Sequence, residues 1–247
     1  MIKFYLAKMR LDKFLANKNI GTRKTCKQII NKLRVKVNGA ITTKNDMQIT
    51  SDDIVEVDNK VIENESYVTL LLNKPEGYIC STIDEKYPSV MNLIPKEYQK
   101  TLRIVGRLDV DTTGLLLLTD NGVLNARLAS PKYNIPKTYK VRVNHLLKKE
   151  LVDVFLKGNI DIGRNEVVTK AILKIIDDYN CEITIFEGKY HEIKRLFGKF
   201  SYDVISLERI KFSFLELDVE KGKYRKIDKN EYKKLLQDVK LNVEDYL

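Results

Sequence analysis

Two short amphipathic patterns follow each other near the start of the chain. Leu11, Phe14 and Leu15 recur at the spacing of one helix face, and Gly21 then ends the pattern. Thr22 can cap a second helix, because its hydroxyl oxygen can accept hydrogen bonds from the free N–H groups of the first turn. The second helix has an apolar stripe made of Cys26, Ile29, Ile30 and Leu33. We therefore expect two short helices here.

A hairpin and a further strand follow these helices. The segment VKVNGAI alternates apolar and polar residues and turns at Asn38-Gly39, a dipeptide that favours tight hairpin turns. The segment DDIVEVD predicts another short strand, and the polar segment DNKVIENES indicates a connection. We expect an N-terminal lead over 1–8, a small binding domain over 9–58 and a linker over 59–66.

From Tyr67 onward the pattern is dominated by strands. The apolar run YVTLLLNK enters a turn at Pro75-Glu76-Gly77. The segments CEITIF and RIKFSF alternate, and their inward-facing residues would be Cys181, Ile183, Ile185, Ile210, Phe212 and Phe214. No regular strand–helix–strand repeat appears. We therefore expect an α+β domain over 67–247, with a mixed, mainly antiparallel sheet flanked by helices.

One segment of this larger domain has helical spacing. In HEIKRLFGKF the apolar residues recur at i, i+3, i+4 and i+7, as Ile193, Leu196, Phe197 and Phe200. Such a helix would pack its apolar stripe on the sheet. His191 and Lys194 then lie on the flank beside the stripe, where side chains can line a cleft.

The positive charge is concentrated at the N-terminus. The chain has 247 residues and a formal net charge of +10. Residues 1–36 contain eleven basic residues and one acid, Asp12, so this segment accounts for the whole net charge. A patch of this kind attracts a polyanion, nucleic acid before an anionic membrane. The alternative is a solvated helix face without a partner.

Several other classes of protein do not fit the composition. Apolar runs are only a few residues long, far short of a membrane-spanning helix. The N-terminus shows no secretory signal pattern, and the three widely spaced cysteines suit reduced thiols, so we expect a cytoplasmic protein. With two histidines and no paired cysteines, a zinc site is not expected.

The segment GRLDVDTTGLLLLTDNG places Asp109, Asp111 and Asp120 around a Thr-Thr-Gly bend. Asp109 and Asp111 could chelate Mg²⁺, but the further acidic ligands that such a site needs are not nearby. A carboxylate pair for glycoside hydrolysis requires a separation that a sequence does not give. Asp111 is expected to bond the N–H groups of its own bend, and Asp120-Asn121-Gly122 to form a hairpin turn. For Asp109, composition alone favours a surface ion pair with Arg107.

The basic N-terminal segment resembles a known RNA-binding domain. MRLDKFLANKNIGTRKTCKQIINKLRVKVNG is similar to the S4 domain, with Thr22-Arg23 where that family usually has Ser-Arg. The resemblance implies that this domain grips structured RNA, mainly through its phosphates. The residues that it assigns to this role are Arg10, Lys13, Arg23, Lys24, Lys27 and Arg34.

The larger domain resembles the pseudouridine synthases, and specifically the RsuA family, which carries an N-terminal S4 domain. VGRLDVDTTGLLLLTDNG is similar to the family signature. Three further segments match in the same order: LNKPEGYICST at 72–82, KTYKV at 137–141 and FEGKYHEIKRLF at 186–197. The resemblance implies that the protein isomerises uridine in RNA to pseudouridine without a metal or other cofactor.

The same resemblance assigns roles to individual residues. Asp109 would be the nucleophile, Lys194 the cation that favours its ionised form, and Tyr139 the ring against the target base. Arg107 would fill the gap that the flipped-out base leaves in the RNA stack. Lys74 would contact an RNA phosphate, and Lys132 is a further candidate for such a contact.

The segment GKYHEIKRLF is most similar to the form found in enzymes that modify small-subunit (16S) ribosomal RNA. Glu192 departs from that form, in which glutamine is more usual. We expect 16S RNA or a small-subunit assembly intermediate as partner, no membrane association, and a monomer. The alternatives are a large-subunit (23S) RNA pseudouridine synthase of the same family and a non-catalytic RNA-binding ribosome-assembly factor.

Overall fold

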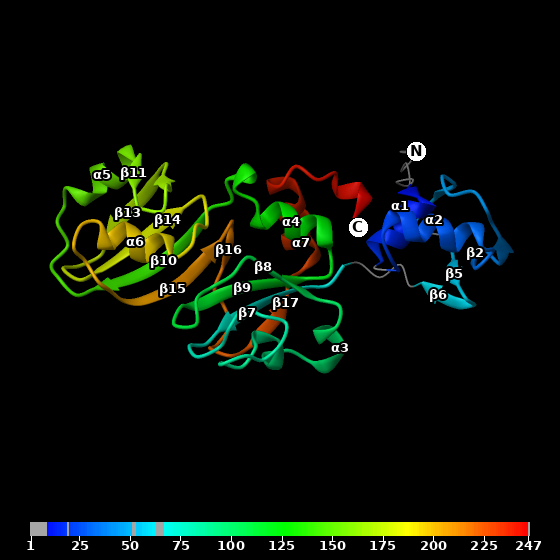
Figure 1. Ribbon diagram of the computed structural model, residues 1–247, viewed down its shortest axis with the longest axis horizontal. Coiled ribbons are helices and arrows are strands. Elements are labelled where there is room, and N and C mark those ends of the chain that lie inside the picture. The colour runs from blue at the N-terminus through cyan, green and yellow to red at the C-terminus, as the bar shows by residue number, and fades with distance from the viewer. Residues whose placement is uncertain (1–8, 19, 51–52, 63–66, 247) are drawn as a thin grey trace. The chain divides into compact units, whose positions relative to one another are not determined.

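The chain divides into two compact units, which are described separately (Figure 1). The computed structural model describes residues 9–18, 20–50, 53–62 and 67–246, so the predicted lead over 1–8 lies outside the described residues. One unit contains Met1–Tyr67 together with Asn242–Leu247, and the other contains Val68–Leu241.

The N-terminal unit has the two predicted helices, α1 (Leu11–Asn17) and α2 (Arg23–Asn31). Thr22 caps α2 as expected, because its Oγ1 accepts a hydrogen bond from the Thr25 N–H at 3.1 Å. A four-stranded antiparallel sheet follows, in the order β3 (Ala40–Ile41), β2 (Val35–Val37), β5 (Val55–Val57) and β6 (Lys60–Ile62). A second pair joins β1 (Met9–Arg10) to β4 (Gln48–Ile49).

The boundaries of this unit differ from the predicted ones. Strand β6 lies inside the predicted linker, because Asp58 and Asn59 take left-handed conformations and return the chain to pair with β5. Residues 63–66 of the predicted linker lie outside the described residues. Asn242–Leu247, which we assigned to the larger domain, groups with the N-terminal unit. Leu33 lies beyond the end of α2 and is 56% exposed, so its place on the apolar stripe was wrong.

The larger unit is built on a nine-stranded sheet, which confirms the predicted mixed, mainly antiparallel arrangement. Its main path is β13 (Ala171–Ile175), β14 (Asn180–Ile185), β10 (Lys137–Val143), β15 (Val204–Phe212), β9 (Thr113–Thr119), β7 (Thr69–Lys74) and β17 (Tyr224–Lys226). Strand β8 (Arg103–Val105) also pairs with β9, and β16 (Leu215–Glu216) with β15. The pair β9–β15 is parallel, whereas the other pairs of this sheet are antiparallel.

The parallel pair joins β9, which follows the acidic bend, to β15, about a hundred residues later in the sequence. This pairing depends on a glycine. Gly114 has a φ of +101°, and a Cβ at this position would lie 2.3 Å from the carbonyl oxygen of Arg209. No other residue type would allow β9 and β15 to approach each other there. The four leucines at 115–118 that follow are fully buried, as befits a central strand.

Strand β15 differs from its predicted pattern. A β-bulge interrupts its pairing with β10, so that Tyr139 faces Arg209 while Thr138 faces Lys211. Arg209 is therefore turned inward and is 1% exposed, whereas Ile210 remains half-buried. The strand ends at Phe212, and Phe214 lies beyond it. The inward alternation predicted for Ile210 and Phe214 was wrong because one bulge changes the side-chain phase of a strand.

The predicted helix near residue 193 is present as α6 (Glu192–Gly198), which packs against β15 (Figure 1). Its buried side chains include Ile193, Leu196 and Phe197, as expected. Helices α3 (Lys96–Gln99), α4 (Gly122–Ala129), α5 (Leu151–Lys157) and α7 (Lys229–Asp238) were not predicted. The described residues also include the hairpin of β11 (Ile160–Asp161) and β12 (Val167–Val168), and the short 3₁₀ turns Val90–Leu93, Pro131–Tyr133 and Val243–Asp245.

The predicted hairpin turn at Asp120-Asn121-Gly122 was wrong, because Asn121 begins a helix. Its Oδ1 accepts hydrogen bonds from the N–H groups of Val123 at 3.1 Å and Leu124 at 2.9 Å, which caps α4. Helix α4 packs against β8, and the Asn125 side chain donates a hydrogen bond to the Ile104 carbonyl at 3.2 Å. This helix and strand frame the loop that carries Asp109.

Candidate active site

The loop between β8 and β9 carries Asp109 and is held in place by neighbouring segments. The Gly77 N–H donates to the Val110 carbonyl at 2.9 Å, and the Leu108 N–H donates to Cys80 Sγ at 3.3 Å. Within the loop, the Thr112 N–H donates to the Asp109 carbonyl at 3.1 Å. Burial raises the pKa of Cys80, which keeps this thiol neutral as a hydrogen-bond acceptor. The loop therefore presents Asp109 from a fixed backbone.

Lys74 is part of the same support. Its side chain is fully buried, and Nζ donates to the carbonyl oxygens of Pro75 at 3.1 Å, Val110 at 3.3 Å and Thr112 at 2.8 Å. Burial lowers the pKa of this ammonium, whereas the charges of Asp111 and Asp109 oppose that shift. An ammonium has three N–H donors, and here three carbonyls receive them. The prediction that Lys74 contacts an RNA phosphate was therefore wrong.

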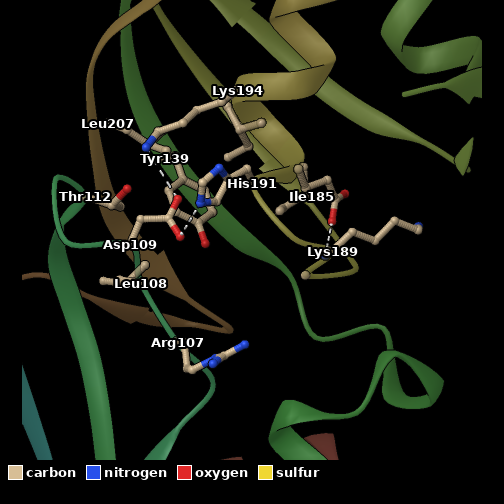
Figure 2. Close-up of a pocket in the computed structure, with 13 residues that line it drawn as sticks. Arg107, Leu108, Asp109, Thr112, Tyr139, Ile185, Lys189, His191, Lys194 and Leu207 are labelled. Carbon is tan, nitrogen blue, oxygen red and sulfur yellow. Dashed lines mark hydrogen bonds and ion pairs between the residues drawn. The ribbon is translucent and has the colours of Figure 1, made fainter. Parts of the chain in front are cut away.

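The carboxylate of Asp109 lies between two nitrogen groups at the mouth of a pocket (Figure 2). His191 Nε2 is 3.4 Å from Oδ1, and Lys194 Nζ is 3.4 Å from Oδ2. The Asp109 side chain is 33% exposed, so the carboxylate can be reached from solvent. Tyr139, on β10, lines the same pocket and is 6% exposed. The structure thus brings together the three residues assigned to catalysis.

Lys194 also holds the second acid of the bend. Its Nζ lies 2.6 Å and 2.8 Å from the two carboxylate oxygens of Asp111. Partial burial raises the pKa of Asp111, but the hydrogen bond and charge of Lys194 outweigh it, so the net shift is downward. We expected the Asp111 carboxylate to accept hydrogen bonds from the N–H groups of its own bend and did not predict its contact with Lys194. One ammonium is shared by two carboxylates, which keeps both acids of the site next to a cation.

The predicted alternative of an ion pair between Arg107 and Asp109 is not observed. Among the described residues, the Asp109 carboxylate instead contacts the His191 imidazole and the Lys194 ammonium. Arg107 lines the pocket, but its side chain extends away from the Asp109 carboxylate (Figure 2). Arg107 is thus available to a ligand at the pocket rim.

The imidazole of His191 is held by stacking. His191 precedes α6 in a left-handed conformation with a φ of +47°. Its ring stacks on Tyr190 with centroids 3.9 Å apart and planes 14° apart, and the Arg164 guanidinium lies 4.4 Å from the Tyr190 ring centre. This stack fixes the ring that contacts Asp109.

Two cationic side chains lie near Tyr139, the buried Arg209 and the half-buried Lys137, and the sequence patterns did not indicate either. Arg209 Nε donates to the Leu115 carbonyl at 2.6 Å, and the guanidinium carbon lies 6.0 Å from the Tyr139 ring centre. Lys137 Nζ donates to the carbonyls of Ile135 at 3.0 Å and Glu187 at 3.1 Å. Burial, helped by the charge of Arg209, lowers the pKa of Lys137 to about 8. A charged residue within an apolar strand is the signal that could have indicated Arg209.

Glu192, the departure from the family pattern, is 4% exposed. One of its carboxyl oxygens, Oε2, accepts a hydrogen bond from the Lys189 N–H at 2.7 Å, which closes the turn before α6. Burial raises the pKa of Glu192. Because the charge of a buried carboxylate is disfavoured, the glutamate adds less negative charge to the pocket than its sequence position implied.

Three basic residues of the N-terminal unit surround the carboxylate of Asp12. Asp12 is fully buried, and its carboxylate is 3.1 Å from Arg10 Nε, 3.3 Å from Arg23 Nη2 and 3.9 Å from Lys27 Nζ. All three basic side chains stay at least 42% exposed. Asp12 thus holds Arg10, Arg23 and Lys27, all assigned to RNA binding, close together in one cluster at the surface.

The other residues assigned to RNA binding lie outside this cluster. Arg34 pairs with Asp58, Lys13 Nζ lies 5.8 Å from the Tyr246 ring centre, and Lys24 is exposed. Together these side chains keep the positive charge of the unit at its surface.

Comparison with known proteins identifies both parts of the chain. Residues 68–199 match the family model described as RNA pseudouridylate synthase, and residues 9–55 match the S4 domain. Within the described residues, no group of three or more His, Cys, Asp or Glu is arranged to hold a metal ion. No helix in the same part of the chain is long and apolar enough to cross a membrane.

Similar proteins cover nearly the whole chain. Ribosomal small subunit pseudouridine synthase A of Haemophilus influenzae is 38% identical, over 93% of this chain and 100% of the relative. The protein of the same name from Escherichia coli K12 is 34% identical, over 90% of this chain and 98% of the relative. A crystal structure of a pseudouridylate synthase superposes with a TM-score of 0.67 at 36% identity, covering 92% of this chain and 99% of that chain.

Proposed function

This chain belongs to the RNA pseudouridylate synthase family, and we propose that it converts a uridine of small-subunit (16S) ribosomal RNA to pseudouridine. The observation that carries the proposal is the position of Asp109. Its carboxylate is partly exposed and lies between His191 and Lys194, in a pocket that Tyr139 also lines.

The reaction needs a group that can form and release a covalent bond. The N1–C1′ bond of uridine breaks, the base turns within the pocket, and C5 forms the new bond to C1′. C5 then loses its proton and N1 gains one, which restores the unsaturated ring and leaves the composition of the nucleoside unchanged. A carboxylate nucleophile splits such a change into two easier steps. Asp109 would add either to C1′ of the ribose or to the base ring and be expelled when the new bond forms.

The neighbouring residues suit this role. The Lys194 ammonium lies 3.4 Å from the Asp109 carboxylate and offsets its negative charge beside an RNA polyanion. The Tyr139 ring offers a flat surface on which a flipped-out uracil can stack. Its hydroxyl group is the candidate acceptor for the C5 proton. Arg107, at the pocket rim, would occupy the gap that the base leaves in the RNA stack.

The choice of 16S RNA rests on the relatives. The proteins from H. influenzae and E. coli are named for the ribosomal small subunit, which disfavours the 23S alternative. The intact group of Asp109, Tyr139 and Lys194 speaks against a non-catalytic assembly factor. A ribosomal substrate would place the protein in the cytoplasm. We also expect the enzyme to act as a monomer.

The proposal is tested by tritium release from a 16S RNA transcript that carries ³H at C5 of uridine. Formation of pseudouridine releases this tritium to water, so the protein should release it with a stoichiometry near one per transcript. A 23S transcript labelled in the same way is the control for the target. Release from neither transcript would contradict the activity, and release from 23S RNA alone would contradict the target.

A further inference from the structure

Two larger cavities adjoin the catalytic pocket, and they differ in charge. One, of about 410 Å³, shares Lys194 with the catalytic pocket, and its lining holds three carboxylates, of Glu76, Asp111 and Glu208, against two ammonium groups, of Lys194 and Lys221. The other, of about 480 Å³, shares Arg107 and also contains Arg103, with no carboxylate among its lining residues. A polyanion that enters the catalytic pocket is therefore attracted more strongly by the second cavity than by the first. We call the second cavity the Arg107 pocket.

The walls of the Arg107 pocket come from β8, α4 and the segment after β7. Besides the two arginines, they include Cys80, Ile104, Gly122 and Ala126. The hydrogen bond from Asn125 to the Ile104 carbonyl holds α4 against β8, so these walls are fixed. A Cβ added at Gly122 would meet no atom within 4 Å, which shows that the cavity is open above this glycine. Small and apolar walls of this kind suit the flat face of a nucleobase.

The two arginines are free of carboxylate partners in the described structure. Arg103 Nη1 donates to the carbonyls of Lys100 at 3.1 Å and Leu102 at 3.3 Å, and these hydrogen bonds hold the guanidinium group in place at the cavity. No ion pair or hydrogen bond of the Arg107 side chain is found among the described residues. A guanidinium can stack on a base and bind a phosphate with the same planar group.

We propose that the Arg107 pocket binds the base of the nucleotide adjacent to the target uridine in the same RNA strand. This inference rests on the proposed function, because it requires a uridine in the catalytic pocket. Arg107 lines both cavities, so one side chain can contact both occupants, and two consecutive bases are close enough to share such a contact. The pocket would then select the sequence or conformation next to the modified uridine.

The test fills the cavity without straining the backbone. Gly122 has no left-handed φ, and a side chain placed there points into open space, so Gly122→Leu should fold. Val123 is the next residue of α4, is 38% exposed and does not line the pocket, which makes Val123→Leu the matched control. Ala126→Leu fills the same cavity from one turn further along α4.

The readout is kcat/KM for tritium release from the labelled 16S transcript. Because stacking of one base contributes on the order of tenfold or more to binding, Gly122→Leu and Ala126→Leu should each lower kcat/KM about tenfold. Val123→Leu should behave as wild type. Thermal unfolding of all three variants checks that the fold is kept.

A second experiment identifies the occupant. Once the modified uridine is mapped, short RNAs are prepared in which each neighbouring nucleotide is abasic. One abasic position should lower wild-type kcat/KM about tenfold. The same abasic position should not lower the kcat/KM of Gly122→Leu any further, because the RNA change and the substitution remove the same interaction.

The outcomes separate this inference from the proposed function. No tritium release by the wild type would overturn the proposed function. An active wild type with unchanged Gly122→Leu and Ala126→Leu, or with fully additive effects of the abasic position and Gly122→Leu, would overturn the assignment of the Arg107 pocket.

Discussion

At the scale of single residues, Asp109 differs from the other acids of its bend in the partners of its carboxylate. Asp120 Oδ1 accepts a hydrogen bond from the Val68 N–H at 2.9 Å and so supports the fold. Asp111 is bonded through both oxygens to Lys194. Within the part of the chain that the structure describes, the Asp109 carboxylate has only longer contacts, at 3.4 Å, to His191 and Lys194. A nucleophile needs this combination of nearby positive charge and an oxygen that is not fully engaged.

Lys137, half-buried on the same strand as Tyr139, gives a prediction about how stability depends on pH. The pKa of Lys137 is lowered to about 8 in the folded protein, mainly by burial, from an ordinary value of 10.5. Between these values the unfolded chain binds more protons than the folded one. The contribution of Lys137 to the free energy of unfolding is therefore largest above about pH 10.5. This contribution is lost as the pH falls through about 8.

The measurement is the free energy of unfolding of wild type and Lys137→Met between pH 7.5 and 10.5, with urea as denaturant. The difference, wild type minus variant, should rise with pH by up to about 1.4 kcal/mol per unit. Lys140→Met, an exposed lysine on the same strand, is the control and should show no such rise. A flat difference for Lys137→Met would mean that this lysine titrates as in the unfolded chain.

At the scale of elements, short-range patterns predicted those parts of the fold that local chemistry determines. Helix α2 with its Thr22 cap, the turn at Asn38-Gly39 and the apolar stripe of α6 are all encoded within a few residues. The bulge in β15 was not predictable, because it is defined by pairing with β10, about seventy residues away. The parallel pairing of β9 with β15 has the same long-range origin.

Helices α7 and α4 were not predicted, for different reasons. Helix α7 begins with a capping box of Asp228 and Glu231, a signal that was present in the sequence but not used. Helix α4 was missed because Asp120-Asn121-Gly122 fits a hairpin turn as well as a helix cap. The candidate site was predicted better than these elements, because its residues are recognised by motif, whereas Lys74 shows that a motif does not reveal burial.

The support of the acidic bend by β7 gives a prediction at this scale. Lys74→Met leaves the carbonyls of Pro75, Val110 and Thr112 without their donor, so the variant should lose about 2–4 kcal/mol of unfolding free energy. Its kcat for tritium release should fall, because the loop that presents Asp109 loosens. The salt dependence of RNA binding should stay unchanged, since the buried ammonium does not contact a phosphate.

Urea unfolding, single-turnover kinetics and RNA binding at several salt concentrations check these three expectations. A Lys74→Met protein with normal stability, or with a salt slope reduced by one phosphate contact, would contradict the structural role of Lys74. Lys132→Met, which removes an exposed lysine of the same unit, is the matched control for stability.

At the scale of the whole molecule, the division of charge matches the division into two units. The segment that carries the whole net charge lies in the unit with the S4 domain, whereas the acidic bend lies in the larger unit. The larger unit supplies the chemistry, and the basic unit supplies affinity for a polyanion without sequence information of its own.

This division predicts how RNA binding responds to salt. Arg23→Gln combined with Lys24→Gln removes two exposed charges of the basic unit and should lower the slope of log K against log salt by about 1.4–1.8. The control, Lys149→Gln with Lys157→Gln, removes two exposed charges around α5 and should leave the slope unchanged. Equal slopes for both double variants would contradict RNA binding by the N-terminal unit.

The central claim is that one carboxylate, that of Asp109, carries out the reaction. It is tested most directly by comparing tritium release from C5-labelled 16S RNA by wild type, Asp109→Asn and Asp111→Asn, alongside RNA binding by all three. Both substitutions remove one negative charge beside Lys194 with little change in shape. We predict that Asp109→Asn binds RNA as the wild type does but releases no tritium, whereas Asp111→Asn still releases it. Tritium release by Asp109→Asn at the wild-type rate would show that Asp109 is not the nucleophile.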